Sequence, residues 1–347
     1  MKKQWNGNNM SPDNEQLPPI VWVETGRKIP RYGLNNAKLL RLLHPMLKQF
    51  RVTDSEDKQE GIQVFKINEK SKSDLTRRFE AIQKSFIFKQ EYFWLGTTSR
   101  FFYLYDFMID SGLSKVIHME SDCILLSLDG VRKLSKLEEN FVAFPLQTLN
   151  EGCASIFYVN SQEALREFLE FTLDYWHVPS ETDMTILGRF SRNGKAKILD
   201  TWPEKNQENK LIYDAGSLGP YYLGSDARNF RIPFSRRGRL DLRPGSIGFR
   251  IREAHFCWTV KREEERISVE LEIENEIYHL QNLHVHSKQI AKSVNKLHRQ
   301  LKYSFNRTIS PCWELGNLDM IVVLERCVSF AQRRVNKALT HKSVNLR

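Results

Sequence analysis

The chain has 347 residues, of which 41% are hydrophobic and 11% aromatic, and its formal net charge is +10. This length and composition fit a globular protein with a substantial core and exclude collagen-like, coiled-coil and largely disordered chains. No apolar run approaches the roughly 20 residues of a membrane helix, and the polar first residues lack the apolar core of a signal peptide. The 5 cysteines are scattered and form no C-x-x-C pair, so we expect a reducing, cytoplasmic compartment.

The positive charge is concentrated at the C-terminal end. Residues 287–347 contain twelve Lys or Arg against three Asp or Glu, a net +9 of the total +10. We therefore expect a flexible arm over residues 1–18, a catalytic body over 19–290 and a basic helical extension over 291–347. The basic helices are predicted at 288–303 and 318–338.

The second of these helices has apolar residues at helical spacing beside basic ones. We expect its apolar face to pack on the body, and contact with an anionic membrane surface is the alternative. A non-enzymatic protein that binds anions or nucleic acid through this extension is a further alternative. Nucleic acid is not an expected partner, because the extension contains no RNA-reading motif.

The predicted elements of the first third alternate between strand and helix. Residues 19–24 and 62–67 are apolar runs typical of strands, and residues 35–50 carry an apolar stripe at helical spacing. Further helices are predicted at 73–85 and 99–111. This order favours an α/β fold whose strands are joined by crossovers.

The remaining elements surround a short acidic motif. A buried strand is predicted at 116–119 and a second apolar run at 123–126, and further strands are predicted at 141–145, 155–159 and 283–286. Helices are expected at 161–176, where Ser161 can act as N-cap, and at 184–190. A hairpin is predicted over 250–274, with its turn at 261–265, and the glycine-rich segment 214–224 is too irregular for a regular element.

The acidic motif consists of Glu120 and Asp122, which follow the strand at 116–119 directly. In an extended chain, alternate side chains share a face, so the two carboxylates are expected to project together. Two hard oxygen ligands at the end of a buried strand suit a divalent cation, and that cation could hold a diphosphate. The alternative is a surface turn with two solvated acids.

Late in the body, His284, His286 and Lys288 alternate along the chain. In a strand they share a face, where imidazole can bind Mn²⁺ and the lysine can meet a phosphate. An edge strand with two incidental histidines is the alternative. His286 is placed ahead of His284 only because it lies nearer Lys288.

With these elements in order, the chain resembles a nucleotide-sugar-dependent glycosyltransferase of the GT-A type over about residues 20–290. E-S-D at 120–122 resembles the D-x-D metal motif, with Glu in place of the first Asp. C-A-S-I-F-Y-V-N at 153–160 looks like the strand beside the sugar, and T-D-M-T-I-L at 182–187 is similar to the acidic helix start bordering it. N-L-H-V-H-S-K at 282–288 resembles the late His and Lys of glycogenin-like transferases.

The resemblance implies a Rossmann-like mixed sheet flanked by helices and a donor that is a nucleoside-diphosphate sugar, with UDP favoured. It also implies a glycan or lipid-linked acceptor and a Mn²⁺ or Mg²⁺ ion. The implied metal ligands are Asp122, Glu120, His286 and His284. A nucleotidyltransferase would also use paired acids and Mg²⁺, but it should not need the late histidines.

Four residues are candidates for the sugar and diphosphate. Asp183 is a candidate catalytic carboxylate or a plain helix cap, and Asp214 is a candidate contact to a sugar hydroxyl or a turn residue. Lys288 and Arg100 are candidate ligands of the diphosphate, although a surface role is the alternative for Arg100.

Overall fold

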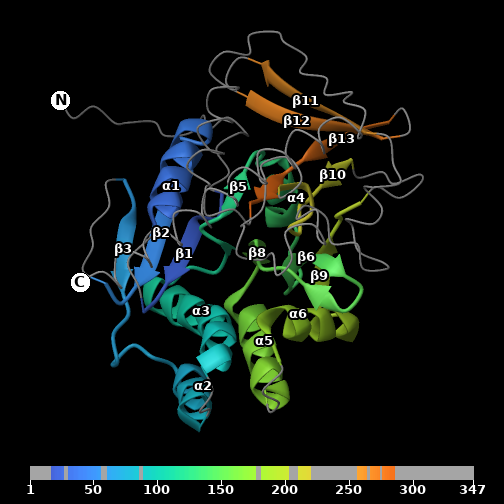
Figure 1. Cartoon of the computed structure of the whole chain (residues 1–347). Helices are drawn as coiled ribbons and strands as arrows, with labels where there is room; N and C mark the ends of the chain where they lie inside the picture. Colours follow the sequence, from blue (N-terminus) through green and yellow to red (C-terminus); the bar gives the residue numbers. More distant parts are fainter. Residues whose placement is uncertain are drawn as a thin grey trace, which may run out of the picture.

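The computed structural model describes residues 17–26, 30–55, 61–85, 89–176, 181–202, 210–219, 256–263, 266–273 and 276–285 (Figure 1). Over these residues the fold is a mixed β-sheet flanked by helices, which confirms the predicted α/β class. Among the described helices, none combines the length and apolar character needed to cross a membrane. The basic helices, His286, Lys288 and residues 220–255 of the body lie outside the described residues.

Eight of the described strands form the central sheet, in the order β3-β2-β1-β4-β8-β6-β7, with β9 paired to β6. Their bounds are β1 Ile20–Glu24, β2 Gln49–Thr53, β3 Gln63–Lys66, β4 Val116–Met119, β6 Val142–Thr148, β7 Glu151–Gly152, β8 Ile156–Val159 and β9 Ala196–Leu199. β1, β2, β3 and β4 run parallel, whereas β8 is antiparallel to β4. After β1 the chain adds β2 and β3 on one side and then returns to place β4 on the other, so the sheet reverses its direction of growth between β1 and β4.

Helices cover both faces of this sheet. Their bounds are α1 Arg31–Leu43, α2 Asp74–Ser85, α3 Lys89–Ser111, α4 Asp129–Ser135, α5 Gln162–Tyr175 and α6 Asp183–Phe190, followed by a 3₁₀ turn at Ser191–Asn193. In Figure 1, α2, α3, α5 and α6 lie together below the sheet. They share one buried cluster with side chains of the sheet, and α1 and α4 share the other.

The alternation of side chains along each strand supplies both clusters. In β4, Val116 belongs to the cluster under α3 and α5, whereas Ile117 and Met119 belong to the cluster under α1 and α4. Neighbouring residues of a strand point to opposite faces, so an apolar strand can fill two layers at once. Glu120 directly follows β4 and is four residues from Val116, so the same alternation directs its side chain toward the face covered by α3.

A smaller group of strands lies beside the sheet. β10 Leu211–Ile212, β13 Glu276–Leu280, β12 Arg266–Ile273 and β11 Phe256–Glu263 form a four-stranded sheet in that order. The chain then enters β14 Asn282–His284, which pairs antiparallel with β5 Cys123–Leu125 and matches His284 with Cys123. This pairing brings the end of the described chain to the acidic motif.

The prediction of a helix over residues 35–50 was wrong for the C-terminal half of that range. α1 ends at Leu43, and residues 49–53 form β2 instead. Pro45 explains the early end, because proline disfavours the helical conformation of the residue before it. Leu42 and Met46, which were assigned to the apolar stripe, are 60% and 91% exposed.

Most other predicted elements are present with shifted bounds. The helix predicted at 99–111 begins ten residues earlier as α3, and the last strand ends at His284 rather than at 286. The hairpin is present as β11 and β12. α4, β7, β9, β10 and β13 were not predicted, because they are short or carry mixed polar and apolar residues.

Ser161 is the N-cap of α5, as predicted. Its Oγ accepts a hydrogen bond of 3.0 Å from the backbone N–H of Ala164. We expect Ser161→Ala to lower the free energy of unfolding by about 1 kcal/mol, because one N–H of the first turn loses its acceptor. Urea unfolding checks this value against Ser135→Ala, a control hydroxyl that only donates to the exposed Arg132 carbonyl. Equal effects of the two substitutions would contradict the cap.

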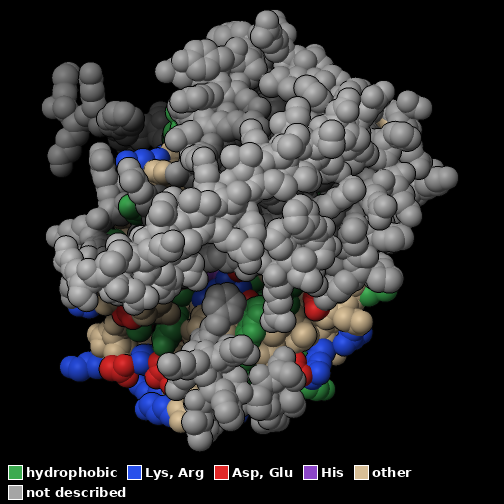
Figure 2. All heavy atoms as spheres, viewed as in Figure 1, with side chains coloured by type: hydrophobic (Ala, Val, Ile, Leu, Met, Phe, Trp, Pro, Cys, Tyr) green, Lys and Arg blue, Asp and Glu red, His purple; other side chains and the backbone are tan. Residues whose placement is uncertain are grey.

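Figure 2 shows acidic and basic side chains interspersed over the helices at the bottom of the view. Several form surface pairs, such as Arg166 with Glu163 and Glu170 on α5. Exposed pairs of this kind contribute little to stability.

Candidate metal and substrate site

The E-S-D motif forms a rigid turn at the carboxyl end of β4. The N–H of Cys123 donates to the Glu120 carbonyl at 2.9 Å, which closes the turn. From α1, the buried Asn36 amide donates to the carbonyls of Ser121 and Cys123 at 3.1 and 2.6 Å. The Ser121 hydroxyl donates to Glu24 at the end of β1. These bonds hold the backbone between the two acids in one conformation.

His284 faces both carboxylates of this turn. Its Nε2 lies 2.9 Å from Oε2 of Glu120 and 3.5 Å from Oδ1 of Asp122. The backbone N–H of Val285 donates to the Asp122 carbonyl at 2.7 Å, which fixes the chain beside the turn. The side chain of His284 is 6% exposed, whereas that of Asp122 is 30% exposed. The group therefore has one face toward solvent, on the side of Asp122.

Arg100 joins the turn to α6. From α3, its guanidinium donates to Oε1 of Glu120 and to Oδ2 of Asp183. Asp183 is buried, and the capping of α6 is performed by Thr182, whose Oγ accepts from Thr185 N–H at 3.1 Å. The carboxylate of Asp183 is thus not needed as the cap, and it points to Arg100 instead. Three segments far apart in sequence meet at this arginine.

The charges in this group shift one another. Burial alone would raise the pKa of Glu120, but Arg100 and His284 outweigh it and hold that pKa well below its usual range. Burial raises the pKa of Asp183, with Arg100 opposing it. Burial would lower the pKa of His284, but Cys153, Glu120 and Asp122 hold it well above its ordinary value. A cation that binds Nε2 must therefore displace a proton, and cation affinity is expected to fall at low pH.

Asp214 organises the backbone around His284. Its Oδ1 accepts N–H bonds of 2.9, 2.8 and 2.9 Å from Gly216, Ser217 and Leu218, and its Oδ2 accepts bonds of 2.6 and 2.9 Å from Gly219 and His284. A Cβ on Gly219 would lie 2.1 Å from the His284 carbonyl, so this close approach requires glycine. The carboxylate is 1% exposed. Its five donors favour the predicted turn residue over the predicted contact to a sugar hydroxyl.

We expect Asp214→Asn to lower the free energy of unfolding by about 2–3 kcal/mol, because the amide NH₂ would face a backbone N–H that then has no acceptor. Urea unfolding measures this loss. Asp174→Asn, on the exposed face of α5, is the matched control and should change stability by less than about 0.5 kcal/mol. A loss no larger than that of the control would contradict the role of Asp214.

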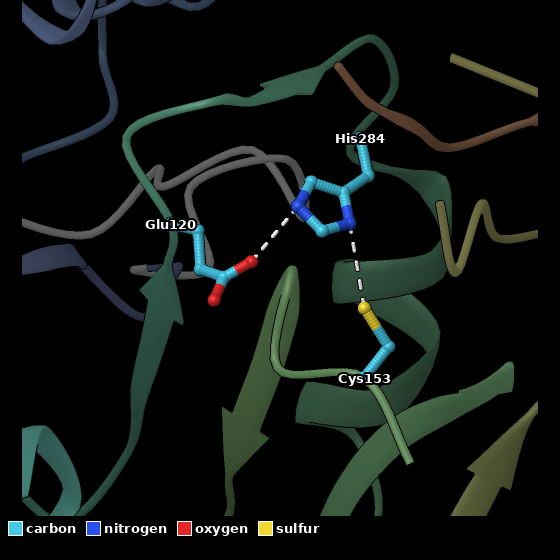
Figure 3. Close-up of side chains that lie close together, drawn as sticks. All are labelled: Glu120, Cys153 and His284. Atoms are coloured by element: carbon cyan, nitrogen blue, oxygen red, sulfur yellow. Dashed lines mark hydrogen bonds and ion pairs between the residues drawn. The ribbon is translucent and has the colours of Figure 1, made fainter. Parts of the chain in front are cut away.

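Cys153 completes the group. Its Sγ lies 3.4 Å from Nδ1 of His284, on the opposite side of the ring from Glu120 (Figure 3). Glu120, Cys153 and His284 offer potential ligand atoms that all lie within 4.8 Å of one another.

The donor set fits a hard or borderline divalent cation. Two carboxylates and one imidazole nitrogen converge from the turn and from β14, and Asp122 leaves the group open to solvent on one side. Mixed oxygen and nitrogen donors suit Mn²⁺, and Mg²⁺ accepts the oxygens. Besides the close group of Glu120, Cys153 and His284, Asp122 offers an oxygen 3.5 Å from Nε2 of His284.

The predicted site residues are thus distributed as follows. One group contains Glu120, Asp122, His284, Arg100 and Asp183. Asp214 supports this group by accepting a hydrogen bond from the backbone N–H of His284. His286 and Lys288 lie outside the described residues. The side chain of Arg100 is 11% exposed and pairs with two acids, so it is not the surface residue that was considered as its alternative.

The sequence analysis did not identify Cys153 as a partner of His284. It also did not identify Asn282, which supports the backbone at Asp214. The Asn282 side chain donates to the Asp214 carbonyl at 3.0 Å and to Sγ of Cys123 at 3.3 Å. Neither residue belongs to a recognisable motif. The only signal was that both lie in segments already singled out, C-A-S-I-F and N-L-H-V-H.

No protein-family model matches the sequence, and no curated protein matches it significantly. Among solved structures, the chain is similar to the galactosyltransferase LgtC in complex with donor and acceptor sugar analogues, with 14% identity over 53% of this chain and 73% of that chain and a TM-score of 0.36. It is also similar to mouse xyloside xylosyltransferase 1, with 12% identity over 56% and 87% of the two chains and a TM-score of 0.37.

A third similar structure is a cytidylyltransferase from Leptospira borgpetersenii, with 9% identity over 63% of this chain and 89% of that chain and a TM-score of 0.33. Two of these three proteins are glycosyltransferases. Similarity at this level does not establish an activity, so the function is inferred from the site itself.

Proposed function

We propose that this protein is a metal-dependent glycosyltransferase that moves a sugar from a nucleoside-diphosphate sugar to a glycan or lipid-linked acceptor. The observation that carries the proposal is the convergence of Glu120, Asp122 and His284 at the carboxyl end of β4. UDP is the nucleotide we expect, on the basis of the resemblance of the E-S-D and late histidine segments.

The position of this group in the sheet supports a nucleotide site. Open α/β sheets bind ligands outside the carboxyl ends of their strands, where the strand order reverses. Here the reversal lies between β1 and β4. Glu24 is the last residue of β1, and Glu120 directly follows β4. A nucleotide that enters at β1 would direct its diphosphate toward Asp122.

A divalent cation at this site would neutralise the diphosphate as it leaves the sugar, which lowers the barrier by several kcal/mol. The chain supplies the ligands: Asp122 is the more accessible acid, Glu120 is held by Arg100, and His284 contributes its Nε2. Lys288 remains a proposed second contact to the diphosphate.

Asp183 is the carboxylate we assign to the reacting sugar. It is buried next to Arg100, which also holds Glu120. A carboxylate linked to Glu120 through the same arginine can stabilise positive charge that develops on the sugar ring in the transition state. Arg100 donates to both acids and so orients them.

A panel of UDP-, GDP- and CMP-sugars, incubated with the full chain with and without Mn²⁺, tests the proposal. We expect slow hydrolysis of one donor that requires Mn²⁺ and stops with EDTA. A nucleoside triphosphate with a sugar 1-phosphate forms a separate arm. Release of pyrophosphate in that arm, with no hydrolysis of any donor, would replace the proposal with a nucleotidyltransferase.

A further inference from the structure

We propose that Cys153 is a positioning residue that holds the imidazole of His284 with Nε2 directed at Glu120 and Asp122. The inference rests on the metal site of the proposed function and concerns a residue to which that function assigns no role. It starts from the geometry of the ring in Figure 3, which lies between a carboxylate and a thiol.

The two nitrogens of the ring have different partners. Nε2 faces Glu120 at 2.9 Å and Asp122 at 3.5 Å, and Nδ1 faces the sulfur of Cys153 at 3.4 Å. A cation that takes the lone pair of Nε2 leaves the ring proton on Nδ1, which must then donate to an acceptor. In the part of the chain that the structure describes, the sulfur of Cys153 lies within reach of Nδ1 and can accept this proton.

The contact also opposes rotation of the ring. A half turn about the Cβ–Cγ bond would exchange Nδ1 and Nε2 with ring carbons and remove the nitrogen ligand from the carboxylates. Loss of the Nδ1 contact removes a hydrogen bond that only the observed orientation makes. Cys153 therefore favours the orientation in which His284 can bind a cation together with Asp122.

The backbone of Cys153 is itself fixed. Its N–H donates to the Pro145 carbonyl at 2.9 Å, and the residue is 4% exposed. A Cβ on the preceding Gly152 would lie 2.4 Å from Cβ of Leu187, so glycine allows this strand to lie tightly against α6. The thiol thus has little freedom to move away from the ring.

A different arrangement would make Cys153 a metal ligand itself, since its sulfur lies within 4.8 Å of potential ligand atoms of Glu120 and His284. One imidazole cannot direct the same nitrogen to the thiol and to Asp122. A cation on the Nδ1 side would lose Asp122, the most accessible donor. The geometry therefore favours positioning over ligation.

The test compares Mn²⁺ binding to the full-length wild type, Cys153→Ala and Cys153→Ser, without any sugar nucleotide. The electron paramagnetic resonance signal of free Mn²⁺ gives the Kd. We expect Cys153→Ala to raise the Kd by about 10–100-fold, the usual cost of losing the partner of a metal-bound histidine. Cys153→Ser should stay near the wild-type value, because its hydroxyl can accept the same proton. An unchanged Kd for Cys153→Ala would overturn the proposal.

A second measurement tells a positioning role from direct ligation. Wild-type protein loaded with Co²⁺ should show no intense near-ultraviolet band of the kind that a thiolate-to-cobalt bond produces. Such a band, absent in Cys153→Ser, would make Cys153 a ligand and overturn the positioning role. Donor hydrolysis is measured separately: a protein with the expected Mn²⁺ affinities but no hydrolysis of any donor would retain the role of Cys153 and overturn the glycosyl transfer.

Discussion

Replacing Asp122 with asparagine is expected to lower Mn²⁺-dependent sugar transfer by about 10³-fold or more while the protein remains folded. The substitution removes a charged oxygen ligand from the open side of the site, and metal-ion stabilisation of a leaving group is worth several kcal/mol, or several factors of ten in rate. Asp122 is 30% exposed on its side chain, so the fold does not depend on its burial. Single-turnover rates at saturating Mn²⁺ measure the loss.

The matched control for this substitution is Asp174→Asn, which removes an exposed carboxylate from α5. It should leave the rate unchanged. A folded Asp122→Asn protein with the wild-type rate would end the assignment of Asp122 as a metal ligand.

Replacing Arg100 with methionine is expected to lower the free energy of unfolding by about 3–5 kcal/mol at pH 7. Arg100 lies between Glu120 and Asp183, and removal of one partner from a buried ion pair leaves the other charge uncompensated. Methionine has a similar length and an apolar end, so the loss of charge dominates the effect. Urea unfolding at pH 7 measures it.

The same substitution makes a prediction about pH. Without Arg100, burial raises the pKa of Asp183 further, because the guanidinium no longer opposes it. The pKa of Glu120 also rises from its wild-type value, although His284 continues to lower it. An acid whose pKa is higher in the folded than in the unfolded state binds more protons when folded, at any pH between the two pKa values. The folded variant therefore gains stability as the pH falls through that range. The difference in unfolding free energy between wild type and variant should therefore shrink from pH 7 to pH 5.

Arg166→Met is the control for this pair of measurements. Arg166 also bridges two glutamates, but on the exposed face of α5. Its replacement should change stability little at either pH, since solvent screens exposed pairs. A loss for Arg100→Met that is as small, or that stays constant between pH 7 and pH 5, would contradict the buried charge cluster.

Local patterns in the sequence predicted the frame of the site well. The apolar strand at 116–119, the acids that follow it and the cap at Ser161 depend on neighbouring residues, so spacing and composition suffice. The boundary error at α1 has the opposite origin. The apolar spacing continues past Leu43, so the predicted helix was extended beyond Pro45, the proline that ends it in the structure.

The long-range contacts could not be predicted in this way. Arg100 and Asp183 are 83 residues apart, and Cys153 and His284 are 131 residues apart. Each pair meets only because the sheet order places α3, α6 and β14 around the end of β4. The role of Asp214 was hidden for a related reason. An aspartate in a glycine-rich segment fits a turn and a sugar contact equally well, and the five backbone N–H groups around it distinguish the two.

The most direct measurement of the central claim is a crystal structure of the full chain grown with Mn²⁺ and UDP, with anomalous scattering used to locate the manganese. The proposed site predicts an anomalous peak about 2.0–2.6 Å from a carboxylate oxygen of Asp122 and from Nε2 of His284, with oxygen atoms of the diphosphate completing the coordination. A peak elsewhere, or UDP bound at the sheet with no manganese between it and Asp122, would contradict the claim.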